Sequence, residues 1–233
     1  MEIELLIVDH GTRDNPNIAL TFDDGPNPYF TPKVLDILRS NGCQATFFMI
    51  GRWAQEYHEI VKRIAFEGHA IGGHSFNHGG DDGLKPSSDL RLGNKVIEDI
   101  IGCSLRYVRV PKFAYSARER DGSLRVKELL EDDFQTKIRS REVTIVGCDI
   151  DPADWNYDIS VEEIIQQTLC GVRNGSIIDL HDGSQKKHQH VDRAARTIEA
   201  LPGIINQLKG RNFNLVSLNS MCLEYETKRF QIL

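Results

Sequence analysis

Two adjacent carboxylates, Asp23 and Asp24, follow a short hydrophobic run in the segment TFDDGP, residues 21–26. A glycine and a proline come next, so the chain is expected to turn sharply just after the two acids. On such a turn the two side chains can diverge, one toward a metal ion and the other toward a water molecule. The alternative is an ordinary solvated Asp-Asp-Gly turn, and the segment alone leaves both interpretations open.

Two histidines, His74 and His78, stand four residues apart after another short apolar stretch. Imidazoles at this spacing can point the same way, as they do in zinc-binding helices. With one carboxylate they form a three-ligand site that leaves a coordination position open for water, as a catalytic zinc requires. Because the chain has eight histidines, surface or core histidines remain the alternative when this pair is considered alone.

Three further polar groups follow later hydrophobic runs. They are Arg109 with Pro111, the segment 149–155 (DIDPADW), and His181 with Asp182. In a parallel α/β barrel the carboxyl ends of the strands converge on the face that carries the active site. Five polar clusters, each after a predicted strand, therefore predict one shared site. For Asp182, a place beside the metal and a capping role in the loop are both open.

The hydrophobic pattern alternates between short runs and helical stretches. The expected strands are Ile18–Phe22, Ala45–Ile50, Ala70–Gly72, Tyr107–Val110, Val143–Cys148, Ser176–Leu180 and Asn214–Ser217. The expected helices are Thr31–Gly42, Ala54–Glu67, Ser88–Ile101, Leu124–Asp132, Val161–Cys170 and Val191–Lys209, the last broken or kinked at Pro202. This alternation predicts an α/β fold with a parallel sheet that closes into a barrel. Without a visible linker or repeat, we expect a single domain over residues 1–233.

The overall composition is that of an ordinary globular protein. Hydrophobic residues make up 40% of the 233 residues, and the net charge is −6. This charge gives no electrostatic footprint for nucleic acid or an anionic membrane. The five cysteines are scattered without a CxxC spacing, which argues against a disulfide framework or a cysteine-ligated zinc. Because the first residues lack the pattern of a signal peptide, we expect a cytoplasmic protein, or a secreted one if the sequence has been trimmed at its start.

The motifs TFDDGP and HSFNH, supported by LHDG and the DW pair, resemble the polysaccharide deacetylases of the NodB-homology type, carbohydrate esterase family 4. The resemblance runs from about Asn17 to Leu218, which we expect to be the core of the domain. It implies a distorted (β/α) barrel with fewer than eight strands, in agreement with the seven strands counted above.

The resemblance also implies the roles of individual residues. Asp24, His74 and His78 are the implied metal ligands, usually for zinc, with cobalt or nickel as possible substitutes. Asp23 is the implied general base and Arg109 the arginine that holds it in place. His181 is the implied general acid and Asp154 the carboxylate that orients it, while Trp155 forms an aromatic wall of the acetyl pocket.

Three positions depart from the family pattern. Gly73 replaces the asparagine that often precedes the first metal histidine, and Lys112 follows Pro111 where many members have an aromatic residue at the substrate wall. Asp179 replaces the leucine that lines the acetyl pocket. Since residues 179 and 181 share one face of a strand, we expect Asp179 to face the barrel interior and to need a partner, for which Lys112, Arg109 and His181 are candidates. We hypothesise that it makes the acyl pocket more polar, so that Asp179→Leu raises activity on acetylated chitooligosaccharides.

The function implied is hydrolysis of N-acetyl groups on an acetylated amino-sugar glycan or oligosaccharide, the expected partner of the protein. Three alternatives stay open: an O-acetyl esterase of the xylan type, a cyclic amide or imide hydrolase, and a sugar-binding relative without catalysis. The intact acidic and histidine positions argue against a sugar-binding relative without catalysis. They also argue against a cyclic amide or imide hydrolase, because that branch tends to lose the metal triad.

Overall fold

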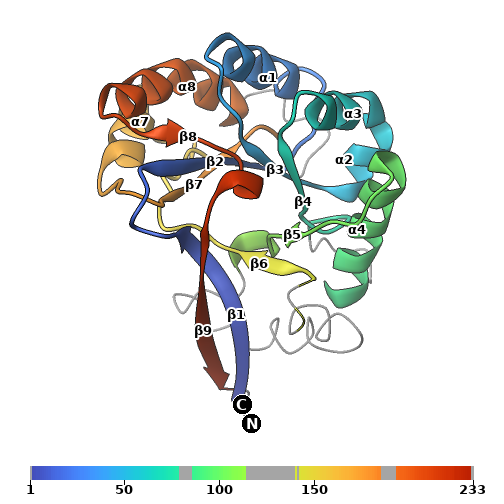
Figure 1. Cartoon of the computed structure of the whole chain (residues 1–233). Coiled ribbons are helices and arrows are strands. Elements are labelled where there is room, and N and C mark those ends of the chain that lie inside the picture. Colours follow the sequence, from blue (N-terminus) through green and yellow to red (C-terminus); the bar gives the residue numbers. More distant parts are fainter. Residues whose placement is uncertain (1, 79–85, 114–139, 141, 185–192, 232–233) are drawn as a thin grey trace.

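The protein is built on one curved sheet with helices on its outer side. The computed structural model describes residues 2–78, 86–113, 140, 142–184 and 193–231. Its strands are β1 (Glu2–Gly11), β2 (Asn17–Asp23), β3 (Thr46–Met49), β4 (Ala70–Gly73), β5 (Tyr107–Val108), β6 (Thr144–Val146), β7 (Ile177–His181), β8 (Asn214–Leu215) and β9 (Leu223–Gln231). The strand order is β7-β2-β3-β4-β5-β6-β1-β9, with β8 paired to β2. Strands β2 to β8 form parallel pairs, which gives the expected distorted α/β barrel (Figure 1).

The strands expected from the sequence did not include β1 and β9, nor the antiparallel pairing between them. β1 pairs in parallel with β6 through Ile7 and Val8, and antiparallel with β9 along most of its length. The two strands form a ribbon that projects from the barrel, with both chain ends at its tip (Figure 1). The sheet is therefore mixed, with nine described strands instead of about seven parallel ones.

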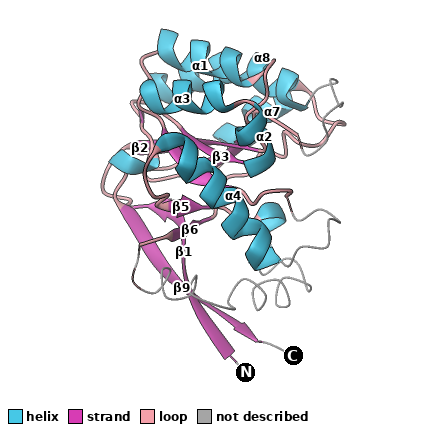
Figure 2. Cartoon of the chain, turned by 90° about the vertical axis from the view of Figure 1, so that its right-hand side faces the viewer, coloured by secondary structure: helices cyan, strands magenta, loops and turns pink. Residues whose placement is uncertain are grey.

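Helices cover the outer face of the curved sheet (Figure 2). They are α1 (Thr31–Ser40), α2 (Gly51–Glu56), α3 (His58–Phe66), α4 (Pro86–Ile101), α7 (Val161–Leu169) and α8 (Arg193–Gly210). The helix expected at Ala54–Glu67 is two helices, because Tyr57 leaves the helical conformation at φ −115° and ψ 43°. α8 continues through Pro202, where a break or kink was expected. The helix expected at Leu124–Asp132 lies outside the described residues. None of the helices described is long and apolar enough to cross a membrane.

Side chains of the central strands alternate between the barrel interior and the helices. Leu20 and Phe22 of β2 and Leu180 of β7 belong to the hydrophobic core shared with the helices. Thr21 and Asp23 alternate with them along β2 and therefore face inward. The parallel register places Thr21 beside Asp179 and Asp23 beside His181. A pleated pair of strands thus brings four polar side chains together inside the barrel, near the carboxyl ends of the strands.

Candidate active site and metal centre

The loop after β2 turns Asp24 away from Asp23. Asp24 has a φ of 70°, a left-handed conformation that few residues other than glycine adopt, and both acids are only 2% exposed. Gly25 follows where a Cβ atom would lie 2.5 Å from Oδ1 of Asp182. The sharp turn expected from the sequence therefore depends on a glycine because a buried carboxyl group packs against it.

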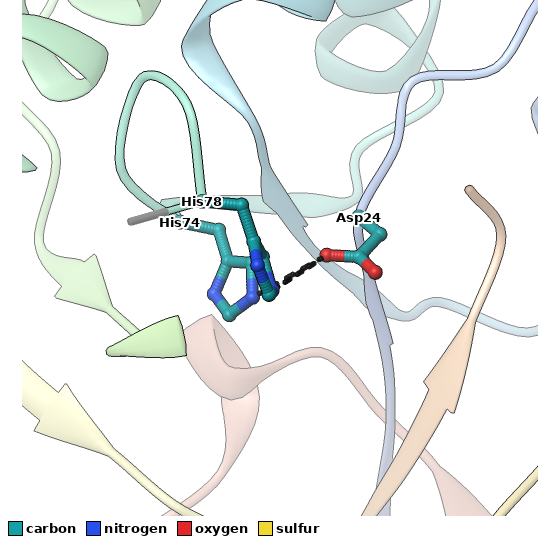
Figure 3. Close-up of side chains that lie close together, drawn as sticks. All are labelled: Asp24, His74 and His78. Atoms are coloured by element: carbon teal, nitrogen blue, oxygen red, sulfur yellow. Dashed lines mark ion pairs between the residues drawn. The ribbon is translucent and has the colours of Figure 1, made fainter. Parts of the chain in front are cut away.

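Asp24, His74 and His78 meet at one point (Figure 3). His78 Nε2 lies 3.1 Å from Asp24 Oδ1, and His74 Nε2 lies 3.6 Å from the same oxygen. The side chains come from two loops, one after β2 and one after β4, and all three are buried. One carboxylate and two imidazoles around a common centre are a suitable donor set for a divalent transition metal.

The protonation of the two histidines fits a role as ligands. Burial lowers the pKa of both imidazoles, for His78 to about 4, so each is neutral at pH 7. His74 Nδ1 lies 2.8 Å from the carbonyl oxygen of Arg109. Since a carbonyl can only accept, this nitrogen carries the hydrogen, and the lone pair of Nε2 faces Asp24. The backbone of Arg109 thus orients one of the candidate ligands.

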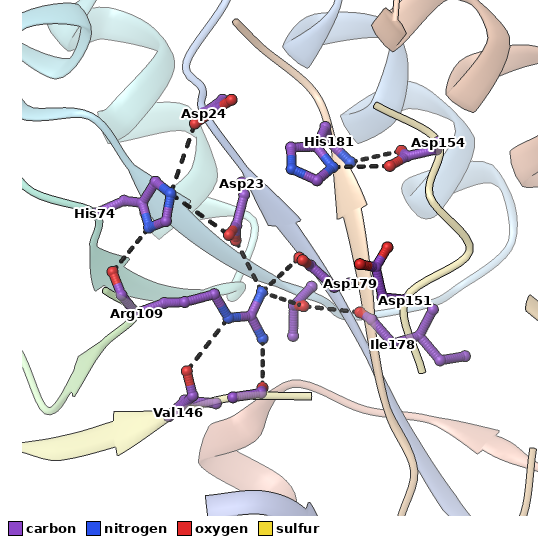
Figure 4. A network of polar contacts seen from close by, with 12 residues as sticks. Asp23, Asp24, His74, Arg109, Val146, Asp151, Asp154, Ile178, Asp179 and His181 are labelled. Carbon is purple, nitrogen blue, oxygen red and sulfur yellow. Dashed lines mark hydrogen bonds and ion pairs between the residues drawn. The ribbon is translucent and has the colours of Figure 1, made fainter. Parts of the chain in front are cut away.

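The guanidinium of Arg109 is fully buried beneath Asp23 (Figure 4). Its Nη1 donates to Asp23 Oδ1 at 2.8 Å, and its Nη2 donates to the carbonyl of Gly147 at 2.8 Å. The guanidinium also lies over the ring of Phe48, 4.3 Å from the ring centre. These contacts hold the arginine rigidly, so it fixes the carboxylate of Asp23 next to the candidate metal ligands.

A second acid–histidine pair lies on the other side of Asp23. His181 Nδ1 donates to Asp154 Oδ1 at 2.8 Å, and Asp154 Oδ2 accepts from the backbone of His181 and from the hydroxyl of Thr197. Burial alone would lower the pKa of His181, but the charge and hydrogen bond of Asp154 outweigh it, and the pKa is raised well above its usual value. His181 is therefore protonated at neutral pH and can donate a proton.

The contacts of Asp182 are those of a loop cap beside the candidate metal site. Its carboxyl group is 1% exposed and accepts a hydrogen bond from the hydroxyl of Thr31 at the start of α1. Desolvation, followed by the nearby charges of Asp23 and Asp24, raises its pKa to about 7. Of the two interpretations left open by the sequence, this contact favours the cap.

The remaining predicted site residues are spread around these groups. Pro111 is buried, Lys112 is exposed with a φ of 60°, and Trp155 is 44% exposed. Asp179 is buried, and its carboxylate accepts from Arg109 Nη1 at 2.7 Å. Arg109 is thus the partner that the sequence left open for Asp179.

Three residues of the site were not identified from the sequence. Thr21 accepts from Arg109, and its place two residues before Asp23 on a strand could have indicated this. Thr197 reaches Asp154 from α8, with no sequence signal to suggest it. Asn94 of α4 occupies the space beside Gly73, where a Cβ atom would meet Asn94 Oδ1 at 1.8 Å. Gly73 therefore lacks a side chain because an asparagine from another element fills its space.

Comparison with known proteins agrees with this geometry. The family description "Polysaccharide deacetylase" matches residues 10–125. A chitooligosaccharide deacetylase of Azorhizobium caulinodans is 34% identical over 89% of this chain and 95% of its own length. The chain belongs to the polysaccharide deacetylase family. A peptidoglycan-N-acetylglucosamine deacetylase of Bacillus cereus is 32% identical over 88% of this chain and 87% of its own length.

A solved structure shows the same fold in this deacetylase family. The Bc1960 peptidoglycan N-acetylglucosamine deacetylase superposes with a TM-score of 0.75 at 30% identity, covering 93% of this chain and 92% of that one. As in the sequence-based expectation, the fold is a distorted (β/α) barrel, and the protein is a polysaccharide or oligosaccharide deacetylase.

Proposed function

We propose that this deacetylase hydrolyses N-acetyl groups of an oligosaccharide that contains N-acetylglucosamine, with one zinc ion bound by Asp24, His74 and His78. The observation that carries the proposal is the placement of Asp23 and His181. Asp23 lies beside the candidate ligands, and His181, on the neighbouring strand β7, pairs with Asp154. A base and an acid on adjacent strands thus lie next to one candidate metal position.

The two groups have opposed duties, and their surroundings suit them. Asp23 accepts a hydrogen bond from Arg109 and can receive a proton from the attacking water. His181 carries a proton and can give it to the departing sugar nitrogen, which leaves as an amine while the acyl group leaves as acetate. A bound zinc ion would supply a Lewis acid that polarises the acyl carbonyl.

The choice of substrate rests on the relatives. Those named above act on chitooligosaccharide and on the N-acetylglucosamine of peptidoglycan. Both names refer to an acetylated amino sugar, and the catalytic arrangement described here suits hydrolysis of the amide bond of its N-acetyl group. We therefore place N-acetyl hydrolysis before O-acetyl ester hydrolysis.

Acetate release from a substrate panel tests the proposal. Acetylated chitooligosaccharides, peptidoglycan fragments and acetylated xylooligosaccharides are assayed with the purified protein, after chelation, and after zinc is returned. We expect release from the amino-sugar substrates, loss on chelation and recovery with zinc. Release from xylooligosaccharides alone would replace the proposal with an esterase, and activity that survives complete metal removal would exclude the metal centre.

A further inference from the structure

Asp179 is a buried carboxyl group that the reaction proposed above does not use. Its side chain is 1% exposed and turns from β7 toward Arg109 (Figure 4). Arg109 is the described residue that hydrogen-bonds to its side chain, at 2.7 Å. Because the carboxyl group points to the arginine and has almost no exposed surface, it offers little contact to an acyl group.

One nitrogen atom of Arg109 serves three acceptors. Nη1 lies 2.8 Å from Thr21 Oγ1, 2.8 Å from Asp23 Oδ1 and 2.7 Å from Asp179 Oδ1. The hydroxyl of Thr21 gives its own hydrogen to the carbonyl of Ile178 at 2.7 Å, so toward Arg109 it can only accept. The direction in which Nη1 points is therefore set by Thr21, Asp23 and Asp179 together.

We infer that Asp179 is a positioning residue, which together with Thr21 holds Nη1 of Arg109 and so fixes the carboxylate of the base Asp23. The inference rests on the deacetylase function proposed above. Without an acceptor at position 179, the guanidinium would lose one of the contacts that set its direction. Asp23 would then lose the fixed orientation that a base needs toward the attacking water.

Hydrogen and charge counting indicate the form in which Asp179 acts. Nη1 has two hydrogens for three acceptors, and two carboxyl groups share a single buried guanidinium. Asp23 lies beside the candidate metal ligands, where a bound cation would compensate its charge, whereas Asp179 has Arg109 alone as a hydrogen-bonding partner among the described side chains. The carboxyl group with fewer compensating contacts is the one that takes up a proton, so Asp179 acts as a neutral acid.

The surroundings of Asp179 support this form. Burial, followed by the charge of Asp23, raises the pKa of Asp179 well above its usual value, and Arg109 and His181 oppose the rise. Asp151 and Cys148, from the segment after β6, also face this group; Asp151 raises the pKa further, and the Cys148 thiol stays neutral because its own pKa is raised. The positive charge of His181 is already compensated by Asp154.

Two substitutions separate this role from that of a pocket wall. Asp179→Asn keeps the shape and the acceptor of a neutral acid, so kcat and KM should stay within about threefold of wild type. Asp179→Leu removes the acceptor, and kcat should fall by about 10²-fold while KM changes little. Metal content should be unchanged in both variants, because Asp179 contacts none of the candidate ligands. Asp158→Asn, an exposed position, controls for the loss of one acidic group.

The outcomes decide the inference. Equal losses in both variants would show that a negative charge is required and would overturn it. Unchanged or higher kcat in Asp179→Leu, the result expected from a polar pocket wall, would overturn it as well. The Arg109 contact makes the opposite result the expected one.

A second measurement does not depend on activity or on the leucine variant folding. In wild-type protein with ¹³C-labelled aspartate, the Asp179 side-chain carbon is identified as the resonance missing from Asp179→Asn. We expect its chemical shift at neutral pH to be that of a protonated carboxyl group. The shift of an ionised carboxylate would overturn the inference. Absence of acetate release by wild type, with a protonated Asp179, would instead refute only the proposed function.

Discussion

The ion pair of His181 with Asp154 sets the pH at which the reaction should lose activity on the alkaline side. Asp154 raises the pKa of His181 well above its usual value, against the effect of burial. A catalytic acid must carry its proton, so kcat/KM falls as the pH rises through this raised pKa. Asp154→Asn removes the charge that raises the pKa and leaves the volume of the side chain nearly unchanged.

The size of the effect follows from the contact. The paired atoms are 2.8 Å apart, and the side chain of His181 is 12% exposed, so solvent screens the pair only slightly. An opposite charge this close shifts a pKa by about 1–3 units, or about 1.4–4 kcal/mol. We therefore expect the alkaline limb of the Asp154→Asn variant to move to lower pH by about 1–3 units.

The same pair contributes to stability with a defined sign. A histidine whose pKa is raised in the folded state adds stability that is fully present below its unfolded pKa of about 6.5. This contribution is lost as the pH rises through the folded pKa. The free energy of unfolding of Asp154→Asn should therefore lie furthest below that of wild type in mildly acidic solution, with a smaller difference at alkaline pH.

The assay is acetate release over a range of pH with one chitooligosaccharide. Asp158→Asn, on the same loop and exposed to solvent, controls for the loss of a charge that does not touch His181. An alkaline limb that stays at the wild-type pH in Asp154→Asn would refute the reasoning, because the acid would then be another group or Asp154 would not control it.

The metal site and the close-packed glycines give further predictions. His78→Ala should lose bound metal and acetate release together, measured by metal analysis of the purified protein; a variant that keeps its metal would remove His78 from the ligand set. Gly25→Ala should lower the free energy of unfolding by about 1–3 kcal/mol through overpacking against Asp182, and an unchanged melting temperature would contradict this contact. Gly73→Ala should destabilise the wild-type chain more than the Asn94→Ala chain, and equal losses in chemical denaturation would show that the two residues do not compete for space.

Much of the barrel could be predicted because its strands are short and apolar, and because the apolar residues between them recur with the period of a helix. The motif strands around Asp23, His74 and His181 all lie where the hydrophobic runs predicted them. β1 and β9 were missed because their pairing joins Glu2 to Gln231, almost the whole chain apart, and no local pattern reports such a contact. The interruption of the expected helix at Tyr57 was missed because no glycine or proline marks it in the sequence.

The site could be predicted where its functional residues lie together in short sequence motifs. Asp24, His74 and His78 lie in two short motifs, and the structure brings them together. Contacts that depend on packing between distant elements were not accessible. Asn94 of helix α4 fills the space at Gly73 of strand β4, and the sharing of Arg109 by two carboxyl groups depends on side-chain directions that a sequence does not give.

The division of labour between two adjacent acids, Asp23 as base and Asp24 as metal ligand, is the central claim. Asp23→Asn tests it most directly, with metal content and acetate release measured on the same preparation beside wild type. We expect the variant to bind as much metal as wild type while kcat falls by about 10²–10⁴-fold, because only the proton acceptor is removed. A variant that retains wild-type turnover with its metal bound, or one that loses the metal, would contradict the claim.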